Sequence, residues 1–80
     1  MYYLYIIKCL DKSLYTGITT DVKRRFLEHK LGKNSRYTRS HGVRRIVYTE
    51  KHKNRSDASK REAEIKKWSR SKKLSIINLR

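Results

Sequence analysis

The chain has 80 residues, the length of one domain, and carries 22 lysines and arginines against 7 acidic residues, a net charge of +15. A chain of this length buries only about 60% of the surface that its unfolded form exposes, so any activity shares the core of a single domain, residues 1–80. The charge favours a polyanionic partner, nucleic acid above all. No expected helix has a broad apolar face opposite its lysines, which argues against a membrane partner.

The N-terminal segment and the cysteine content indicate a compartment. Residues 1–10 are apolar but are interrupted by Lys8, without a basic start or a small-residue cleavage site. No apolar run approaches the length of a membrane span. The single cysteine, Cys9, excludes an internal disulfide and fits a reducing environment. We therefore expect a cytoplasmic protein in which Cys9 is a buried packing residue.

The chain begins with a predicted β-hairpin. Residues 2–9 are aromatic and β-branched, and both alternating faces are apolar, which predicts a strand covered on both sides. Polar residues 11–13 form the turn, and residues 14–16 resume as a second strand that ends at Gly17. The short link makes the pair antiparallel.

A helix is predicted after the hairpin. Thr20 is the expected N-cap, Asp21 adds a favourable negative charge in the first turn, and the helix stops at Gly32. Arg25 and His29 are one helical turn apart and project together. An arginine can grip a phosphate and a histidine can move a proton, although such a pair is also common on a solvated helix face.

The second half of the chain supplies one more strand and two helices. Residues 33–43 are polar and basic and predict a loop. Residues 46–49 predict a third strand, residues 56–69 a second long helix and residues 71–77 a short third helix. The expected fold class is therefore α/β (α+β), with a small three-stranded antiparallel sheet flanked by helices.

Glu62 is the unusual residue of the second helix. It falls between Ala58 and Ile65, beside the apolar stripe. A carboxylate at the rim of a small core needs a partner, because burying an unpaired charge is expensive. Helix geometry leaves two partners open, a metal ion or a neighbouring lysine or arginine. Composition likewise leaves open whether Tyr5 and Tyr15 belong to the core or to a site.

Taken in order, these residues resemble the GIY-YIG nuclease family, and within it the small stand-alone bacterial members of the UPF0213 type. Tyr3 and Thr16 stand where many members have glycine and isoleucine, a departure that leaves both reactive tyrosines in place. The resemblance extends over nearly the whole chain. The matching positions are the two tyrosine motifs at 3–5 and 15–17, Arg25 with His29, Glu62, and Asn78.

The resemblance implies a metal-dependent endonuclease domain. Glu62 would hold a single divalent cation, Mg²⁺ or Mn²⁺, since a carboxylate suits a hard ion. Tyr15 is the first choice for helping to deprotonate the attacking water, with the roles of Tyr5 and Tyr15 open to exchange. Arg25 would stabilise charge on the phosphate, and His29 would hydrogen-bond in the same site.

The substrate expected from the resemblance is DNA rather than RNA, cut at structured or flexible sites, because no additional targeting region is present in the chain. A protein partner for targeting fits the same observation. Two alternatives stay open: a non-catalytic nucleic-acid-binding module that retains the nuclease fold, and a small basic protein that binds RNA or a ribonucleoprotein. The expected nucleic-acid contacts, with Asn78 also a candidate for shaping the site, are Arg24, Tyr37, Arg39, Lys66 and Asn78.

Overall fold

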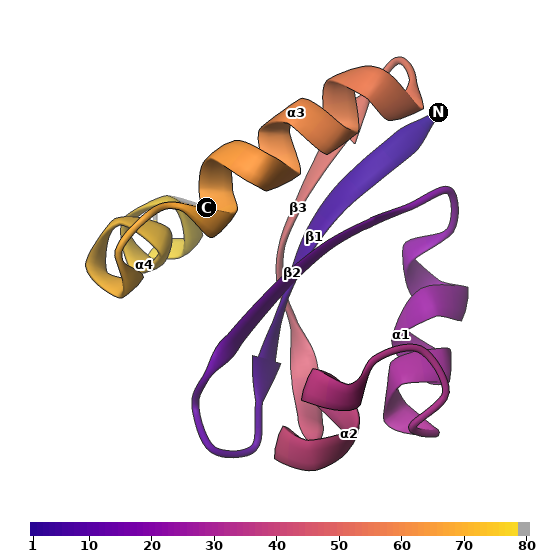
Figure 1. Ribbon diagram of the computed structural model, residues 1–80, viewed down its shortest axis with the longest axis vertical. Helices are drawn as coiled ribbons and strands as arrows, with labels where there is room; N and C mark the ends of the chain where they lie inside the picture. The colour runs from indigo at the N-terminus through magenta and orange to yellow at the C-terminus, as the bar shows by residue number, and fades with distance from the viewer. Residues whose placement is uncertain (79–80) are drawn as a thin grey trace.

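The computed structural model describes residues 1–78 and confirms the expected α/β architecture. Three antiparallel strands form one sheet in the order β2-β1-β3. Helices α3 and α4 cover one face, and α1 and α2 lie on the other (Figure 1). No helix in residues 1–78 is long and apolar enough to cross a membrane. The elements are β1 (Tyr2–Cys9), β2 (Leu14–Thr19), α1 (Val22–Lys30), α2 (Arg36–His41), β3 (Val43–His52), α3 (Arg55–Lys66) and α4 (Arg70–Asn78).

Strand β1 is the centre of the fold, and the prediction that both of its faces are covered is confirmed. Leu4 and Ile6 are fully buried on the side of α3 and pack with Ile65. Tyr5 and Ile7 are buried on the opposite side. Cys9 is buried on that second side too, as expected of a packing residue. Because alternate residues of β1 feed two cores, a small chain buries a complete strand.

Strand β2 is longer than predicted, because Gly17 lies inside it rather than at its end. Gly17 pairs with Tyr5 of β1, and the strand continues to Thr19. A Cβ at position 17 would lie 2.5 Å from the hydroxyl oxygen of Tyr5. The glycine is therefore there to make room for the tyrosine ring, and it does not break the strand.

The N-cap of α1 lies one residue later than predicted. Asp21, not Thr20, is the N-cap, and its carboxylate accepts a hydrogen bond from the backbone N–H of Arg24 at 3.0 Å. An aspartate in extended conformation satisfies an orphan donor directly, so it caps better than a threonine one position earlier. Helix α3 starts earlier than predicted, with Asn54 as its N-cap.

The predicted loop at 33–43 was wrong, since it contains helix α2. The Ser35 hydroxyl accepts hydrogen bonds from the backbone N–H groups of Tyr37 and Thr38, and Gly42 ends the helix with φ of +71°. The helix has only one buried residue, Thr38, so its sequence lacks the apolar periodicity from which a helix is predicted. The segment after it belongs to β3, which starts before the predicted residue 46 and ends after residue 49.

Candidate active site

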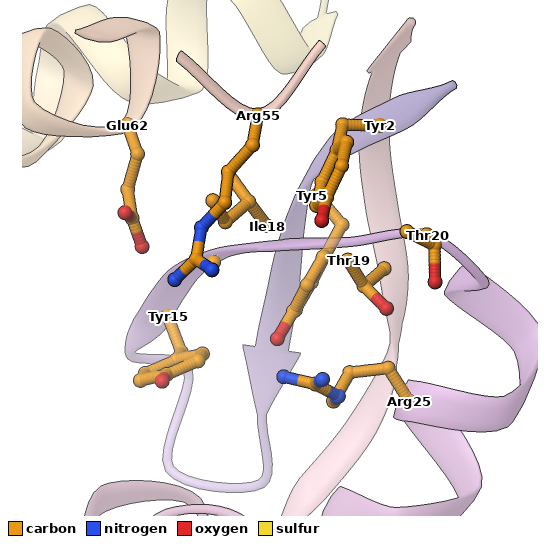
Figure 2. Close-up of a pocket in the computed structure, with 10 residues that line it drawn as sticks. Tyr2, Tyr5, Tyr15, Ile18, Thr19, Thr20, Arg25, Arg55 and Glu62 are labelled. Carbon is orange, nitrogen blue, oxygen red and sulfur yellow. The ribbon is translucent and has the colours of Figure 1, made fainter. Parts of the chain in front are cut away.

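A cavity of about 360 Å³ opens beside β2. Figure 2 shows that its walls come from β1 and β2, from α1 and from α3. Four of the five predicted catalytic residues line it: Tyr5, Tyr15, Arg25 and Glu62. Helix α1 lies on one face of the sheet and α3 on the other, so the cavity collects side chains from both sides of an edge strand.

The fifth predicted residue, His29, lies behind the cavity wall. Its side chain is buried, and its Nε2 atom is 2.8 Å from the hydroxyl oxygen of Tyr5. The imidazole also packs edge-on against the ring of Tyr15, with centroids 5.2 Å apart. His29 therefore contacts both tyrosines and reaches the cavity only through them.

Thr38 completes this buried network from α2. Its hydroxyl donates to the carbonyl oxygen of Ser35 at 3.3 Å and lies 2.8 Å from Nδ1 of His29. Because the hydroxyl proton is used on Ser35, the hydroxyl oxygen accepts from Nδ1–H of His29. Nε2 then carries the free lone pair and accepts the proton of the Tyr5 hydroxyl.

Burial sets the protonation states of this network. It raises the pKa of the Tyr5 phenol far above its ordinary value, and the neighbouring Tyr15 adds to the effect, while Arg25 opposes it. Burial also lowers the pKa of His29, and the positive charge of Arg25 lowers it further. Both groups are therefore neutral at rest, and the hydrogen bond between them connects a phenol with an imidazole base.

Arg25 forms one wall of the cavity from α1. Its side chain is partly exposed, and Nε lies 3.2 Å from Glu28 without the geometry of a hydrogen bond. In Figure 2 the guanidinium reaches toward the hydroxyl of Tyr5. Glu28 thus holds the side chain by charge, and the guanidinium also hydrogen-bonds to the Tyr5 hydroxyl, which opposes the rise in the pKa of that phenol. The guanidinium lines the cavity, where it can bind an anion.

Glu62 enters the cavity from α3 with 23% of its side chain exposed. One oxygen, Oε2, pairs with Lys66 at 3.3 Å, one turn along the helix. The sequence left open a lysine or a metal ion as the partner of Glu62. Lys66 pairs with Oε2, while Oε1 has no hydrogen bond within residues 1–78 and could bind a cation. An exposed pair of this kind is weak and easily exchanged.

The donor set fits a hard divalent cation that is bound through few protein atoms. Nowhere in residues 1–78 do three His, Cys, Asp or Glu side chains gather around one point. Mg²⁺ typically takes one or two carboxylates and keeps waters and phosphate oxygens as its other ligands. Glu62 is the one acidic side chain among the described residues that line the cavity, and it matches that pattern.

The predicted nucleic-acid contacts divide into two groups. Tyr37 is 39% exposed, and its ring lies 5.8 Å from that of Tyr15, so it flanks the cavity. Arg24 is exposed on α1 next to Arg25, and Lys66 is beside Glu62. Arg39 covers Gly32 on another part of the surface, and Asn78 lies at the end of α4; neither lines the cavity.

Three residues of the site escaped the sequence reasoning. Thr38 gives no signal, because the polar sequence of residues 33–43 predicts a loop. Gly17 was interpreted as a strand end, although its position opposite Tyr5 follows from the hairpin register. Arg55 also lines the cavity, but it lies just before the predicted helix start at residue 56, so its place on one helix with Glu62 was missed.

Comparison with known proteins places this geometry in a family. The family described as the GIY-YIG catalytic domain matches residues 1–75. The matched range contains both tyrosine motifs, Arg25, His29 and Glu62 and ends before Asn78. The chain therefore belongs to the GIY-YIG family, whose members are nuclease-like.

Within that family the chain is similar to UPF0213 proteins. One from Staphylococcus haemolyticus is 46% identical over 79 residues, covering 99% of this chain and 96% of the relative. One from Haloquadratum walsbyi is 49% identical over 75 residues, covering 94% and 84%. The solution NMR structure of the UPF0213 protein BH0048 from Bacillus halodurans is 43% identical with a TM-score of 0.64, covering 100% and 86%.

Proposed function

We propose that the protein is a metal-dependent endonuclease that hydrolyses phosphodiester bonds in DNA. The observation that carries the proposal is the convergence of Tyr5, Tyr15, Arg25 and Glu62 on one cavity. These residues come from four elements and both faces of the sheet, and packing alone does not require a carboxylate, a guanidinium and two phenols to meet.

Glu62 is the proposed ligand of one divalent cation, Mg²⁺ or Mn²⁺. When bound, the cation supplies Lewis-acid polarisation of the phosphate and stabilises the leaving oxygen. Arg25 binds the phosphate from the opposite wall and stabilises the negative charge that develops there. Lys66 pairs with the Glu62 carboxylate in the free protein, and a cation held by Glu62 would take over that role.

Two tyrosines compete for the role of activating water. The sequence favours Tyr15, which is only partly buried and lines the cavity. The geometry favours Tyr5, because the Tyr5 proton has an acceptor in Nε2 of His29. Tyr5 then takes a proton from water at its hydroxyl oxygen while its own proton moves to His29, and no free phenolate is needed.

Binding is assigned to the basic surface around the cavity. The net charge of +15 on 80 residues favours a polyanion, and Arg24 and Tyr37 flank the site. Recognition of DNA by shape rather than by sequence accords with a contact surface this small. A protein partner that brings the domain to its target is compatible with the same limit.

A second candidate function is a nucleic-acid-binding module without useful catalysis. The observation in its favour is the ion pair between Glu62 and Lys66, which gives the carboxylate a structural partner. Under this alternative the cation has no part, and the cavity recognises a phosphate through Arg25 alone.

Cleavage of supercoiled, branched and single-stranded DNA, with and without Mg²⁺, separates the two. We expect Glu62→Gln to lose more than about 100-fold in turnover, since mutation of residues that only support a metal ligand already costs about 10–100-fold. Glu64→Gln is the matched control, because Glu64 lies on the same helix, pairs with Arg61 and does not line the cavity. DNA binding without cutting, equal in all three proteins, would transfer the function to the binding module.

A further inference from the structure

Arg55 lines the same cavity as the predicted catalytic residues. It is the first residue of α3, and Figure 2 shows its side chain reaching into the cavity from the helix that also carries Glu62. Arg25 enters from α1 on the other wall. The cavity therefore contains two guanidinium groups, from helices on opposite faces of the sheet.

Arg55 has no acidic partner within residues 1–78, unlike other arginines of the fold. Arg61 pairs with Glu50 and Glu64, and Arg25 lies 3.2 Å from Glu28. Arg55 is exposed and forms no ion pair with any described carboxylate, although Glu62 lines the same cavity. Its charge is therefore not used by the folded protein itself.

The position of Arg55 is also unfavourable for its own helix. The N-terminal end of a helix carries partial positive charge, so acidic residues stabilise it and basic residues destabilise it. Asp57 supplies the favourable charge in the first turn of α3, whereas Arg55 opposes it. Stabilisation of α3 thus gives no reason for an arginine at this place.

Arg55 and Glu62 stand on the same side of α3. Seven residues correspond to about 10.5 Å along a helix axis and to within about 20° of two full turns. Both side chains point into the cavity, and Ala58 and Ile65, also seven residues apart, bury the adjacent side. The guanidinium and the carboxylate therefore face the same cavity from successive turns of one helix.

We infer that Arg55 is a second phosphate-binding residue of this site, and the inference rests on the proposed function. Its ligand is a phosphodiester of the nucleic-acid backbone, gripped by Arg25 from α1 and by Arg55 from α3. The cavity has one net positive charge, from two arginines against one glutamate. This net charge favours binding of an anion over binding of a cation in the free protein. A bound phosphate would then offer its oxygens, beside Glu62, to the divalent cation.

Two variants of Arg55 and one control test the inference. Arg55→Gln removes the charge, and Arg55→Lys keeps the charge but loses the two-pronged donor geometry. Lys60→Gln is the control, since Lys60 is exposed on the same helix and does not line the cavity. Far-UV circular dichroism of each variant checks that this surface substitution leaves the fold intact.

The first readout is binding of a short fluorescent DNA in EDTA over a range of salt concentrations, which is independent of cutting. We expect Arg55→Gln to reduce the salt slope by about one, as for the loss of one phosphate contact, and Arg55→Lys to retain it. The second readout is cleavage with Mg²⁺, where we expect kcat to fall about 10-fold or more in both Arg55 variants and to stay unchanged in Lys60→Gln.

The outcomes separate the inference from the proposed function. If the parent binds and cuts DNA while Arg55→Gln matches Lys60→Gln in slope and kcat, Arg55 is an ordinary solvated arginine and the inference is overturned. If the parent neither binds nor cuts DNA, the proposed function fails and the inference fails with it. A loss of kcat confined to the two Arg55 variants, together with a reduced slope in Arg55→Gln alone, supports both.

Discussion

Helix α3 contributes charged side chains to two regions, and only one of them is satisfied. On the side of β3, Arg61 donates to both oxygens of Glu50 at 2.9–3.1 Å and to Glu64 at 2.7 Å. Glu50 also accepts the hydroxyl proton of Tyr48. Burial by itself raises the pKa of Glu50, but the hydrogen bonds from Arg61, Tyr48 and His52 together outweigh it and hold that pKa below the ordinary value.

At the cavity, carboxylate and guanidinium groups keep donors and acceptors that the folded protein does not use. Glu62 has one weak pair with Lys66, Arg55 has none within the described residues, and the buried Nε of Arg25 has no hydrogen-bond partner there. A carboxylate and a guanidinium that satisfy each other fix a helix in place. The same groups held apart cost stability and keep their donors and acceptors for a ligand.

The comparison predicts opposite effects for the two glutamates. Glu50→Gln should lower the free energy of unfolding by about 2 kcal/mol, because it leaves the partly buried guanidinium of Arg61 without its charge partner. DNA cutting should persist at temperatures where the variant stays folded. Glu62→Gln should leave the free energy of unfolding nearly unchanged. Urea denaturation of the two variants beside the parent measures this, and a large loss of stability in Glu62→Gln would make Glu62 a structural residue.

Gly17→Ala tests the contact between the strands and the site. An added Cβ would lie 2.5 Å from the Tyr5 hydroxyl oxygen and 2.7 Å from its ring, so the ring has to move. We expect a loss of about 1–3 kcal/mol in stability, as for overpacking of a core, and loss of the hydrogen bond to His29. Thermal unfolding and cleavage assays measure the two effects. If the added Cβ clashes mainly with the Tyr5 hydroxyl, the double variant Gly17→Ala/Tyr5→Phe should regain some stability over Gly17→Ala but should not regain cutting.

The pair Tyr5→Phe and Tyr15→Phe decides which phenol activates water. If Tyr5 passes its proton to His29, Tyr5→Phe should lower turnover by about 10²–10⁴-fold, the usual contribution of a positioned base. Tyr15→Phe should cost less, because no described residue accepts its proton. Single-turnover cleavage with Mg²⁺ measures both, and the reverse order would return the role to Tyr15.

The sequence predicts single helices and strands where it carries a local pattern, but it does not predict how they pack into a site. The apolar first strand and the polar start signals of the two long helices place Tyr5, Arg25 and Glu62 on the right elements. Convergence of these elements on one cavity was implied only by the resemblance, because periodicity describes single elements and not their packing. Helix α2 has one buried residue and no apolar stripe, so its contribution to His29 was invisible.

Thr38→Val removes the hydroxyl and keeps the shape of the side chain. Nδ1–H of His29 then loses its acceptor, which should cost about 1–2 kcal/mol of stability and free the imidazole to exchange tautomers. Thr38→Ser is the matched control, since it restores the hydroxyl. Two-dimensional NMR of the imidazole nitrogens reports the tautomer of His29, and an unchanged tautomer in Thr38→Val would show that Tyr5 alone fixes it.

The smallest expected effect is a pH dependence of stability that originates in His29. Burial and Arg25 lower its pKa in the folded protein below the ordinary value of 6.5 that applies when the chain is unfolded. Below about pH 6.5 the unfolded chain therefore binds more protons than the folded protein, so the free energy of unfolding falls as the pH decreases and is fully present above that value. His29→Gln removes this titration, and the difference between the urea unfolding curves of parent and variant isolates it from Asp11 and the other histidines. A parent whose stability, relative to His29→Gln, does not change between pH 7.5 and about pH 5 would mean that His29 binds its proton in the folded protein as readily as in the unfolded chain. Neither burial nor the hydrogen bond from Tyr5 would then keep the imidazole neutral below about pH 6.5.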